Sequence, residues 1–201
     1  MKIEHFNDPF PYTVIDDLYD DYEKTIIWDE LTFLCHPGKM EVPTNTGSAL
    51  GGGQILKKNT ALWIDDLYRD RKFSNILNSN RKIFRFHNEV TGSHPSWFFK
   101  NCEWTNDFTL VSYYENQDEY LPHRDGAYAT CLTWFYREPK KFTGGDLTFV
   151  DYDINIEIAN NKAVIFPSVI THQVHPISMD VRDMGKQQGR FCISQFLHIT
   201  E

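Results

Sequence analysis

The stretch FTLVSYYENQDEYLPHRDGAYATCLTWFY, residues 108–136, marks the point where the chain changes from helix-like to strand-like texture. It is rich in Val, Thr, Phe, Tyr and Trp, arranged in short runs that turn residues separate, which is typical of strands. We expect strands at Phe108–Tyr114 and Thr130–Tyr136, with turn residues over Glu115–Pro122 between them. A β region therefore begins here.

Similar runs continue to the end of the chain without a helical pattern between them. The further predicted strands are Asp146–Val150, Ile154–Ile158, Ala163–Phe166, His172–Ile177 and Arg190–His198. Many short strands of this kind favour a closed or double-sheet β architecture. The polar segment Ser178–Gln188 has little strand character, and we expect it to be an exposed insertion.

The residues before this region predict helices and one long loop. After a short strand at Tyr12–Ile15, the apolar spacing from Asp20 to Leu34 predicts an amphipathic helix, and a second helix is expected from about Asp66 to Val90. The stretch His36–Gln54 is rich in Pro, Gly, Thr and Asn, so we expect a loop that is a candidate active-site lid. We expect the helices to pack on one outer face of the β region.

Length and composition predict one domain. With 201 residues, 41% of them hydrophobic, the chain is large enough for a sizeable core. We expect a single domain over residues 1–201, in which residues 1–105 form a helical support and loop region and residues 106–201 form the β core. The predicted fold class is mainly β with flanking helices.

The net charge, the hydropathy and the cysteine pattern indicate which partners and which cell compartment to expect. A formal net charge of −8 argues against a large nucleic-acid surface. No apolar run approaches the length of a membrane span and the first residues lack a secretion signal, so we expect a soluble cytoplasmic protein with no membrane partner. The four cysteines are far apart and fit neither a disulfide framework nor a zinc cluster. Oligomeric state leaves no mark in the sequence.

The pattern His123-Arg124-Asp125 is a candidate metal site. On an extended backbone, residues two apart point to the same side, so His123 and Asp125 can offer an imidazole and a carboxylate to one ion. The third ligand is expected to be His172, which follows the predicted strand Ala163–Phe166 and a turn with Pro167. Two histidines and one carboxylate leave three positions open, as in non-heme Fe(II) oxygenases. An H-x-D pattern alone is weak, and His175 competes with His172, although strand alternation puts it on the other face.

The context of this pattern strengthens it. From about Phe108 to the C-terminus the chain resembles the prolyl-4-hydroxylase-like branch of the 2-oxoglutarate and Fe(II)-dependent dioxygenases. The resemblance rests on landmarks in a fixed order: Tyr114-Glu115, Tyr120 to Asp125, Thr130 to Tyr136, Gly144-Gly145 to Phe149, Phe166-Pro167 before His172-Gln-Val174, and Gly189-Arg190 to Ser194.

The resemblance implies a fold, a metal and a cosubstrate. The fold would be a double-stranded β-helix of the jelly-roll or cupin-like type, and His123, Asp125 and His172 would hold Fe(II). 2-Oxoglutarate and O2 would be cosubstrates, with ascorbate in support. An arginine fork suits the far carboxylate of 2-oxoglutarate, and Arg190 is the candidate, whereas Arg182 lies closer to His172 at a spacing that the family also permits.

Four further residues are expected to bind the cosubstrate. Tyr114 occupies the family's position for a tyrosine that helps bind 2-oxoglutarate, although it could also be a core aromatic. Ser194 shares a strand face with Arg190 and could add a hydroxyl. Thr130 and Trp134 are expected to face the barrel interior, where the family often has a tyrosine in place of Trp134.

The implied activity is hydroxylation of a C–H bond with release of succinate and CO2. The family suggests a prolyl residue of a protein or peptide, and free amino acids or other small molecules stay open. The presence of Asp125 favours hydroxylation over halogenation, because halogenating members have a small residue there. Nucleic-acid demethylases of this fold carry a second arginine six residues after the first, where this chain has Phe196. A non-catalytic metal-binding barrel is the remaining alternative.

Overall fold

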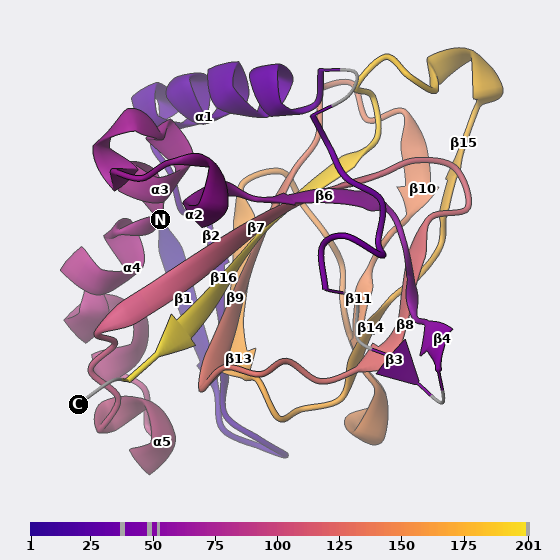
Figure 1. Ribbon diagram of the computed structural model, residues 1–201. Coiled ribbons are helices and arrows are strands. Elements are labelled where there is room, and N and C mark those ends of the chain that lie inside the picture. The colour runs from indigo at the N-terminus through magenta and orange to yellow at the C-terminus, as the bar shows by residue number, and fades with distance from the viewer. Residues whose placement is uncertain (37–38, 48–49, 52, 200–201) are drawn as a thin grey trace.

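Two antiparallel sheets form the body of the molecule in the computed structural model, which describes residues 1–36, 39–47, 50–51 and 53–199. The larger sheet has seven strands in the order β1-β2-β13-β9-β16-β7-β6 (Figure 1). In that order their bounds are Lys2–Phe6, Tyr12–Asp16, Lys162–Pro167, Ala129–Phe135, Arg190–His198, Asn106–Tyr114 and Thr60–Trp63.

The smaller sheet has five strands in the order β12-β11-β14-β8-β5. Their bounds are Ile154–Ile156, Leu147–Phe149, His172–Val174, Glu119–His123 and Lys57–Lys58. Two short strand pairs accompany it: β10 (Phe142–Gly144) with β15 (Ile177–Met179), and β3 (Leu50–Gly51) with β4 (Gln54–Ile55). The predicted mainly β fold class, a double-stranded β-helix with flanking helices, is confirmed.

The two faces of the larger sheet pack against different partners. Alternate residues of β9 show this: Phe135 belongs to the core cluster that includes the helices, whereas Leu132 and Trp134 belong to the cluster between the two sheets. Trp134 and Phe135 are both fully buried. Burying one such side chain stabilises the fold by about 1.5–3 kcal/mol, so both layers hold the sheet in place.

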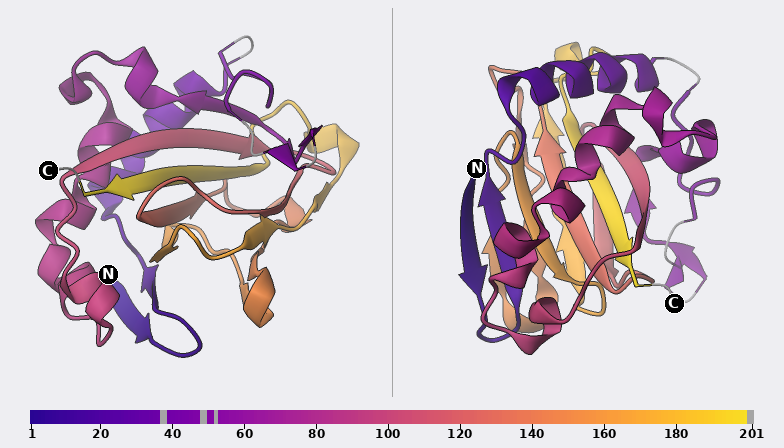
Figure 2. Two further views of the ribbon diagram at one scale, coloured as in Figure 1. Left: turned by 60° about the horizontal axis from the view of Figure 1, so that its bottom comes forward. Right: turned by 90° about the vertical axis from the view of Figure 1, so that its left-hand side faces the viewer.

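Helix α1 (Asp21–Leu34) confirms the first predicted helix. Asp20 and Glu23 form a reciprocal capping box at its start. Its buried residues Ile27, Leu31 and Leu34 belong to the core cluster that includes the helices. Figure 2 shows the helices gathered on one side of the larger sheet, as the sequence predicted. The other face of that sheet is thus left for the interior of the barrel.

The second predicted helix, Asp66–Val90, is wrong as one continuous element. The structure has short segments there: α2 (Ile64–Leu67), η1 (Arg71–Phe73), α3 (Asn75–Asn80), α4 (Lys82–Arg85) and η2 (Asn88–Gly92). The side chains of Asp70 and Ser74 accept backbone N–H groups and so start new segments inside the predicted helix. Helix α5 (Trp97–Lys100) and the short turns η3 (Val150–Tyr152) and η4 (Val181–Asp183) complete the helical segments.

The predicted turn over Glu115–Pro122 is also wrong for its second half, which forms β8. Residues 123 and 120 of β8 pair with residues 172 and 174 of β14, so β8 carries one extra residue in a bulge. Pro122 lies within this irregular stretch, where a missing N–H is tolerated. Pairing with β14 and β5 therefore overrides the local turn signals.

Two other expectations need adjustment. Residues 1–105 are more than helical support and loop, because they supply β1, β2 and β6 to the larger sheet and β5 to the smaller one. The predicted insertion Ser178–Gln188 begins inside β15, where Met179 is buried, and is mostly exposed beyond it. The lid predicted at His36–Gln54 falls partly outside the described residues. Among the described residues, no helix combines the length and apolar character that crossing a membrane requires.

Candidate metal centre

Two histidines face each other across neighbouring strands of the smaller sheet. His123 ends β8, His172 begins β14, and the two are directly paired in the register of these strands. Their ring centroids lie 4.3 Å apart. Side chains of a cross-strand pair are close neighbours on one face of a sheet. Strand pairing thus brings together two residues that are far apart in the sequence.

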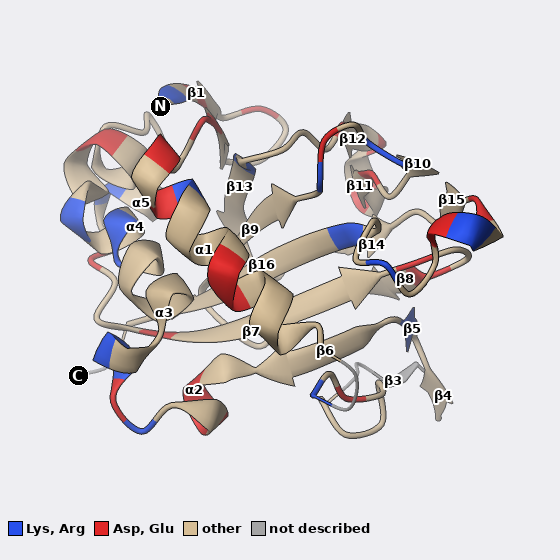
Figure 3. Cartoon of the chain, turned by 90° about the horizontal axis from the view of Figure 1, so that it is seen from above, with Lys and Arg blue, Asp and Glu red and all other residues tan. Residues whose placement is uncertain are grey.

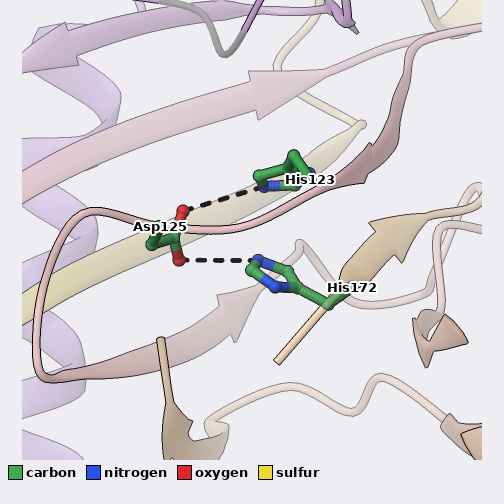
Figure 4. Close-up of side chains that lie close together, drawn as sticks. All are labelled: His123, Asp125 and His172. Atoms are coloured by element: carbon green, nitrogen blue, oxygen red, sulfur yellow. Dashed lines mark ion pairs between the residues drawn. The ribbon is translucent and has the colours of Figure 1, made fainter. Parts of the chain in front are cut away.

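Asp125 supplies a carboxylate to the same point. Its Oδ1 lies 3.8 Å from Nε2 of His123, and its Oδ2 lies 3.5 Å from Nε2 of His172. The candidate ligand atoms of the three residues all lie within 4.8 Å of one another. Figure 4 shows the carboxylate turned toward both rings. The donor set of two imidazoles and one carboxylate, with the remaining side open to a cavity, fits a non-heme Fe(II) ion.

Each histidine is held with Nε2 toward the carboxylate. Nδ1 of His123 lies 2.8 Å from the carbonyl oxygen of Leu121, and Nδ1 of His172 lies 2.9 Å from that of Ile170. A carbonyl oxygen only accepts, so each Nδ1 donates, and in the neutral ring Nε2 then presents its lone pair. Burial and the neighbouring His172 lower the pKa of His123 to about 3. His123 is therefore neutral at pH 7, the form that binds a metal ion.

The carboxylate of Asp125 is oriented by its neighbours. Thr130 Oγ1 donates a hydrogen bond of 2.6 Å to Asp125 Oδ2, and Ser168 Oγ lies 2.8 Å from the same threonine hydroxyl. The backbone N–H of Asp125 donates to the carbonyl oxygen of Ser168. Asp125 follows β8 in a loop, so these bonds to β9 and to the end of β13 fix its position. Partners that orient a ligand in this way usually strengthen metal binding.

Arg190 is a buried cation in the same cavity. It begins β16 and is 0% exposed. Within the described part of the chain, none of its three guanidinium nitrogens has a hydrogen-bond partner. The guanidinium lies 4.7 Å from the ring centroid of Tyr114 and 6.0 Å from that of Trp134. A buried cation that has aromatic contacts but no ion pair among the described residues is costly, and such a guanidinium fits a carboxylate that arrives with a ligand.

Two glycines make room for Arg190. A Cβ on Gly189 would lie 2.0 Å from the carbonyl oxygen of Tyr114, so no larger residue fits where β16 begins beside β7. Gly145 has a φ of +80°, and a Cβ there would lie 3.0 Å from Cδ of Arg190. The Gly144-Gly145 turn and the glycine before Arg190 are therefore part of the site's construction.

We call His123, Asp125 and His172 the metal group. One cavity of about 560 Å³ between the two sheets is lined by the metal group and by Arg190. Tyr114 and Ser194, two of the predicted cosubstrate residues, line it. Burial raises the pKa of the Tyr114 hydroxyl, and the charge of Arg190 opposes that shift. Three further aromatic residues, Trp63, Phe108 and Phe196, also line the cavity.

Two predicted cosubstrate contacts are placed differently. Thr130 does not line the cavity, because its hydroxyl is engaged by Asp125 and Ser168. Trp134 is fully buried behind Arg190 and does not line it either. The alternation of side chains along β9 correctly predicted that Thr130 and Trp134 face the barrel interior. Alternation does not predict how far such a side chain lies from the cavity.

The two alternative residues lie away from the metal group. Arg182, the rival of Arg190, is exposed and forms an ion pair with Asp180. His175, the rival of His172, has its Nε2 2.7 Å from Thr148 Oγ1. The structure thus brings together His123, Asp125, His172 and Arg190, and leaves both rivals outside.

Sequence reasoning missed Lys57 and Tyr120, which also line the cavity. The Tyr120 ring stacks on the His123 ring at 3.4 Å between centroids and 9° between planes. Lys57 lies on the two-residue strand β5, and nothing in its local sequence marks it. Tyr120 is part of the landmark that ends at Asp125. Its position shortly before His123 was therefore the signal that could have identified it as a residue of the site.

The fold and the site together define an Fe(II)- and 2-oxoglutarate-dependent oxygenase. The model of the 2OG-Fe(II) oxygenase superfamily matches residues 108–198, which include every residue of the metal group and Arg190. Over these residues the chain is similar to this superfamily, and it is a 2-oxoglutarate-dependent dioxygenase that uses Fe(II), 2-oxoglutarate and O2. None of the curated proteins compared with the chain matches it in sequence.

Solved structures share the fold along nearly the whole chain. A viral collagen prolyl hydroxylase, vCPH, from Paramecium Bursaria Chlorella virus-1 has a TM-score of 0.60 at 13% identity and covers 94% of this chain and 96% of its own. A Pseudomonas putida prolyl-4-hydroxylase has a TM-score of 0.57 at 12% identity, covering 94% and 93%. A 2OG-Fe(II) oxygenase family oxidoreductase from Burkholderia pseudomallei has a TM-score of 0.63 at 12% identity, covering 93% and 84%. At these identities the likeness concerns the fold.

Proposed function

We propose that the enzyme hydroxylates a C–H bond of a prolyl residue in a protein or peptide, with release of succinate and CO2. The observation that carries the hydroxylase part is the metal group His123, Asp125 and His172 in one cavity with the unpartnered guanidinium of Arg190. The prolyl part is supported by the fold shared with two prolyl hydroxylases. The presence of Asp125 as a third ligand favours hydroxylation, because it occupies the position that halide needs.

In this proposal His123, Asp125 and His172 hold Fe(II) through Nε2, a carboxylate oxygen and Nε2. When bound, the metal together with 2-oxoglutarate and O2 supplies the oxidising chemistry that inserts oxygen into a C–H bond. The chain's own task is to present both imidazoles unprotonated at Nε2, which the Leu121 and Ile170 carbonyls do. Thr130 keeps the carboxylate turned toward the metal position.

Arg190 binds the far carboxylate of 2-oxoglutarate with its guanidinium fork. Tyr114, directly opposite it in the β7–β16 register, adds its hydroxyl to the same pocket, and Ser194 adds another. Trp134 supports the guanidinium from behind with its ring. Arg190 is fully buried, so a charge pair formed with it is stronger than one in water.

The substrate enters from the aromatic side of the cavity, where Trp63, Phe108 and Phe196 are grouped. Trp63 and Phe196 are in ring contact at 5.5 Å. Flat apolar walls suit a pyrrolidine ring or another compact apolar group. Phe196 stands where nucleic-acid demethylases of this fold have an arginine, so we propose a protein, peptide or small-molecule partner over a nucleic acid. A cytoplasmic location stays a prediction.

Incubation with Fe(II), ascorbate and labelled 2-oxoglutarate tests the proposal. We expect slow release of labelled CO2 without substrate, and faster release when a lysate or a panel of proline-containing peptides is added. Mass spectrometry should then find a gain of one oxygen, at a prolyl residue. Asp125→Ala should abolish both, and a D125A variant that still hydroxylates would contradict the assignment of the metal group. A gain of oxygen only on free amino acids would move the substrate to the small-molecule alternative.

A further inference from the structure

Lys57 is a buried cation in the cavity wall whose charge nothing in the described structure balances. The residue is 3% exposed and lines the same cavity as the metal group. Among the described residues, no carboxylate forms an ion pair with it, whereas its neighbour Lys58 pairs with Glu119 at 2.6 Å. Burial lowers the pKa of Lys57 to about 8. An ammonium held in this way costs free energy unless an anion joins it.

The surroundings place this ammonium beside the metal group. Lys57 is paired with Tyr120 in the register of β5 and β8, and its Nζ lies 5.9 Å from the centroid of the Tyr120 ring. That ring stacks directly on His123. In Figure 3 the blue strand β5, which consists of Lys57 and Lys58, lies next to β8. Lys57 therefore belongs to the small-sheet wall, on the His123 side.

The cavity thus has two cations on opposite walls. Arg190 comes from β16 of the larger sheet, and Lys57 comes from the edge of the smaller sheet. Under the proposed function, on which this inference rests, Arg190 takes the far carboxylate of 2-oxoglutarate and the metal takes its other end. The acids in the lining offer Lys57 no partner: Asp65 is paired with Arg71, and Asp125 faces the two histidines. Asp66, also in the lining, forms no ion pair with it among the described residues.

We propose that the Lys57 ammonium binds a carboxylate group inside the cavity. This carboxylate belongs either to the primary substrate or to the metal-bound end of 2-oxoglutarate. If it belongs to the substrate, the substrate class narrows to compounds with a carboxylate near the oxidised bond, such as a free amino acid, a C-terminal residue or an acidic side chain. A bound carboxylate would hold Lys57 protonated by a charge-assisted hydrogen bond.

Binding to the Mn(II)-loaded protein tests this without turnover. One arm measures the Kd of 2-oxoglutarate by calorimetry for the wild type, Lys57→Met, Lys57→Arg and Lys58→Met. The other arm adds small probes to the complex with Mn(II) and 2-oxoglutarate: acetate, L-proline, L-glutamate and N-acetyl-L-proline, each compared with its amide. K58M is the matched control, because Lys58 is an exposed neighbour on the same strand with its own partner.

K57M should weaken one class of ligand by roughly tenfold or more, the loss expected for a charge-assisted bond. Weaker 2-oxoglutarate binding assigns Lys57 to the cosubstrate. Weaker binding of a carboxylate probe, with its amide unaffected, assigns Lys57 to the substrate. K57R should restore part of the affinity, and K58M should match the wild type. Equal affinities of wild type and K57M in both arms would overturn the proposal.

Two controls keep other failures apart. Thermal denaturation should show K57M at least as stable as the wild type, since Met removes a buried charge and keeps the length of the side chain. Release of CO2 from 2-oxoglutarate by the Fe(II)-loaded wild type reports on the proposed function itself. No release would contradict that function, whereas release with unchanged carboxylate binding in K57M contradicts only the role of Lys57.

Discussion

The hydroxyl of Thr130 orients the carboxylate of Asp125, although Thr130 itself does not line the cavity. Its bond of 2.6 Å to Asp125 Oδ2 fixes a carboxylate that stands in a loop, where backbone geometry alone would leave it free to rotate. Ser168 completes the arrangement from the end of β13. At this scale, an oriented ligand depends on its neighbour as much as on its own identity.

Thr130→Val keeps the shape of this residue and removes the bond. We expect the affinity for Mn(II) to fall about 10–100-fold, the usual loss when a ligand's orienting partner is removed. Calorimetry with Mn(II) measures it. Thr133→Val on the same strand is the control, because Thr133 belongs to the face of β9 that points away from the metal group. Equal Mn(II) affinity in T130V and the wild type would contradict the orienting role.

At the scale of elements, the start of β16 decides where Arg190 stands. Gly189 passes so close to Tyr114 that a methyl group would meet its carbonyl oxygen, and its own N–H donates to Tyr113 Oη at 3.1 Å. The strand can therefore enter the sheet, and aim its first side chain into the cavity, only with glycine before it.

Gly189→Ala should destabilise the fold by about 1–3 kcal/mol, the usual cost of overpacking, and should also weaken 2-oxoglutarate binding by displacing Arg190. Urea unfolding and calorimetry measure the two effects. Gly126→Ala serves as the stability control, since a Cβ there meets nothing within 4 Å. A G189A variant as stable as G126A would mean that β7 and β16 adjust without strain.

The turn between β7 and β8 carries a pH-dependent element. Asp118 Oδ2 accepts the backbone N–H of Glu115 at 2.8 Å, and the Asp118 carbonyl accepts that of Ile177. Burial raises the pKa of Asp118 to about 6. The folded state therefore holds this proton more tightly than the unfolded chain, so the group's stabilising contribution is present below about pH 4 and is lost as the pH rises through 6.

Asp118→Asn imitates the protonated form at every pH. The melting temperature of D118N minus that of the wild type should be positive at pH 7.5 and should shrink as the pH falls from about 6 to 4. Scanning calorimetry across this range measures it. A difference that stays constant with pH would mean that the pKa of Asp118 is the same in the folded and unfolded chain.

At the scale of the whole molecule, the barrel interior holds positive charges that form no ion pair with the described acidic residues. Arg190 and Lys57 are buried cations that face a cavity from opposite sheets. The free protein bears their desolvation cost, and ligand binding relieves it. Stability of the fold and occupancy of the cavity are therefore linked.

Arg190→Met separates the stability of the free protein from the stabilisation that ligand binding adds. Without ligand, R190M should melt at or above the wild-type temperature, because a buried unpaired charge is gone. With Mn(II) and 2-oxoglutarate at about 100 times Kd, the wild type should gain about 5–10 °C, and R190M should gain far less. Arg182→Met should behave like the wild type, because Arg182 is exposed. A full ligand-induced shift in R190M would move the carboxylate site away from Arg190.

His172 and Arg190 were predicted with the help of a resemblance to a known family, and the role of Arg190 stays a prediction. The sequence alone predicted the strand-rich second half, the first helix and the H-x-D pattern. These features are local, because a strand's alternation and a motif's spacing can be read within a few residues.

Tertiary structure alone decided the rest. Strand β8 forms in a stretch with turn-like composition because β14 and β5 pair with it. The second predicted helix breaks where Asp70 and Ser74 bind backbone groups. Thr130 became a partner of Asp125, and Lys57 became buried, through contacts with distant segments. Burial and long-range pairing depend on which segments meet, and no local pattern records that.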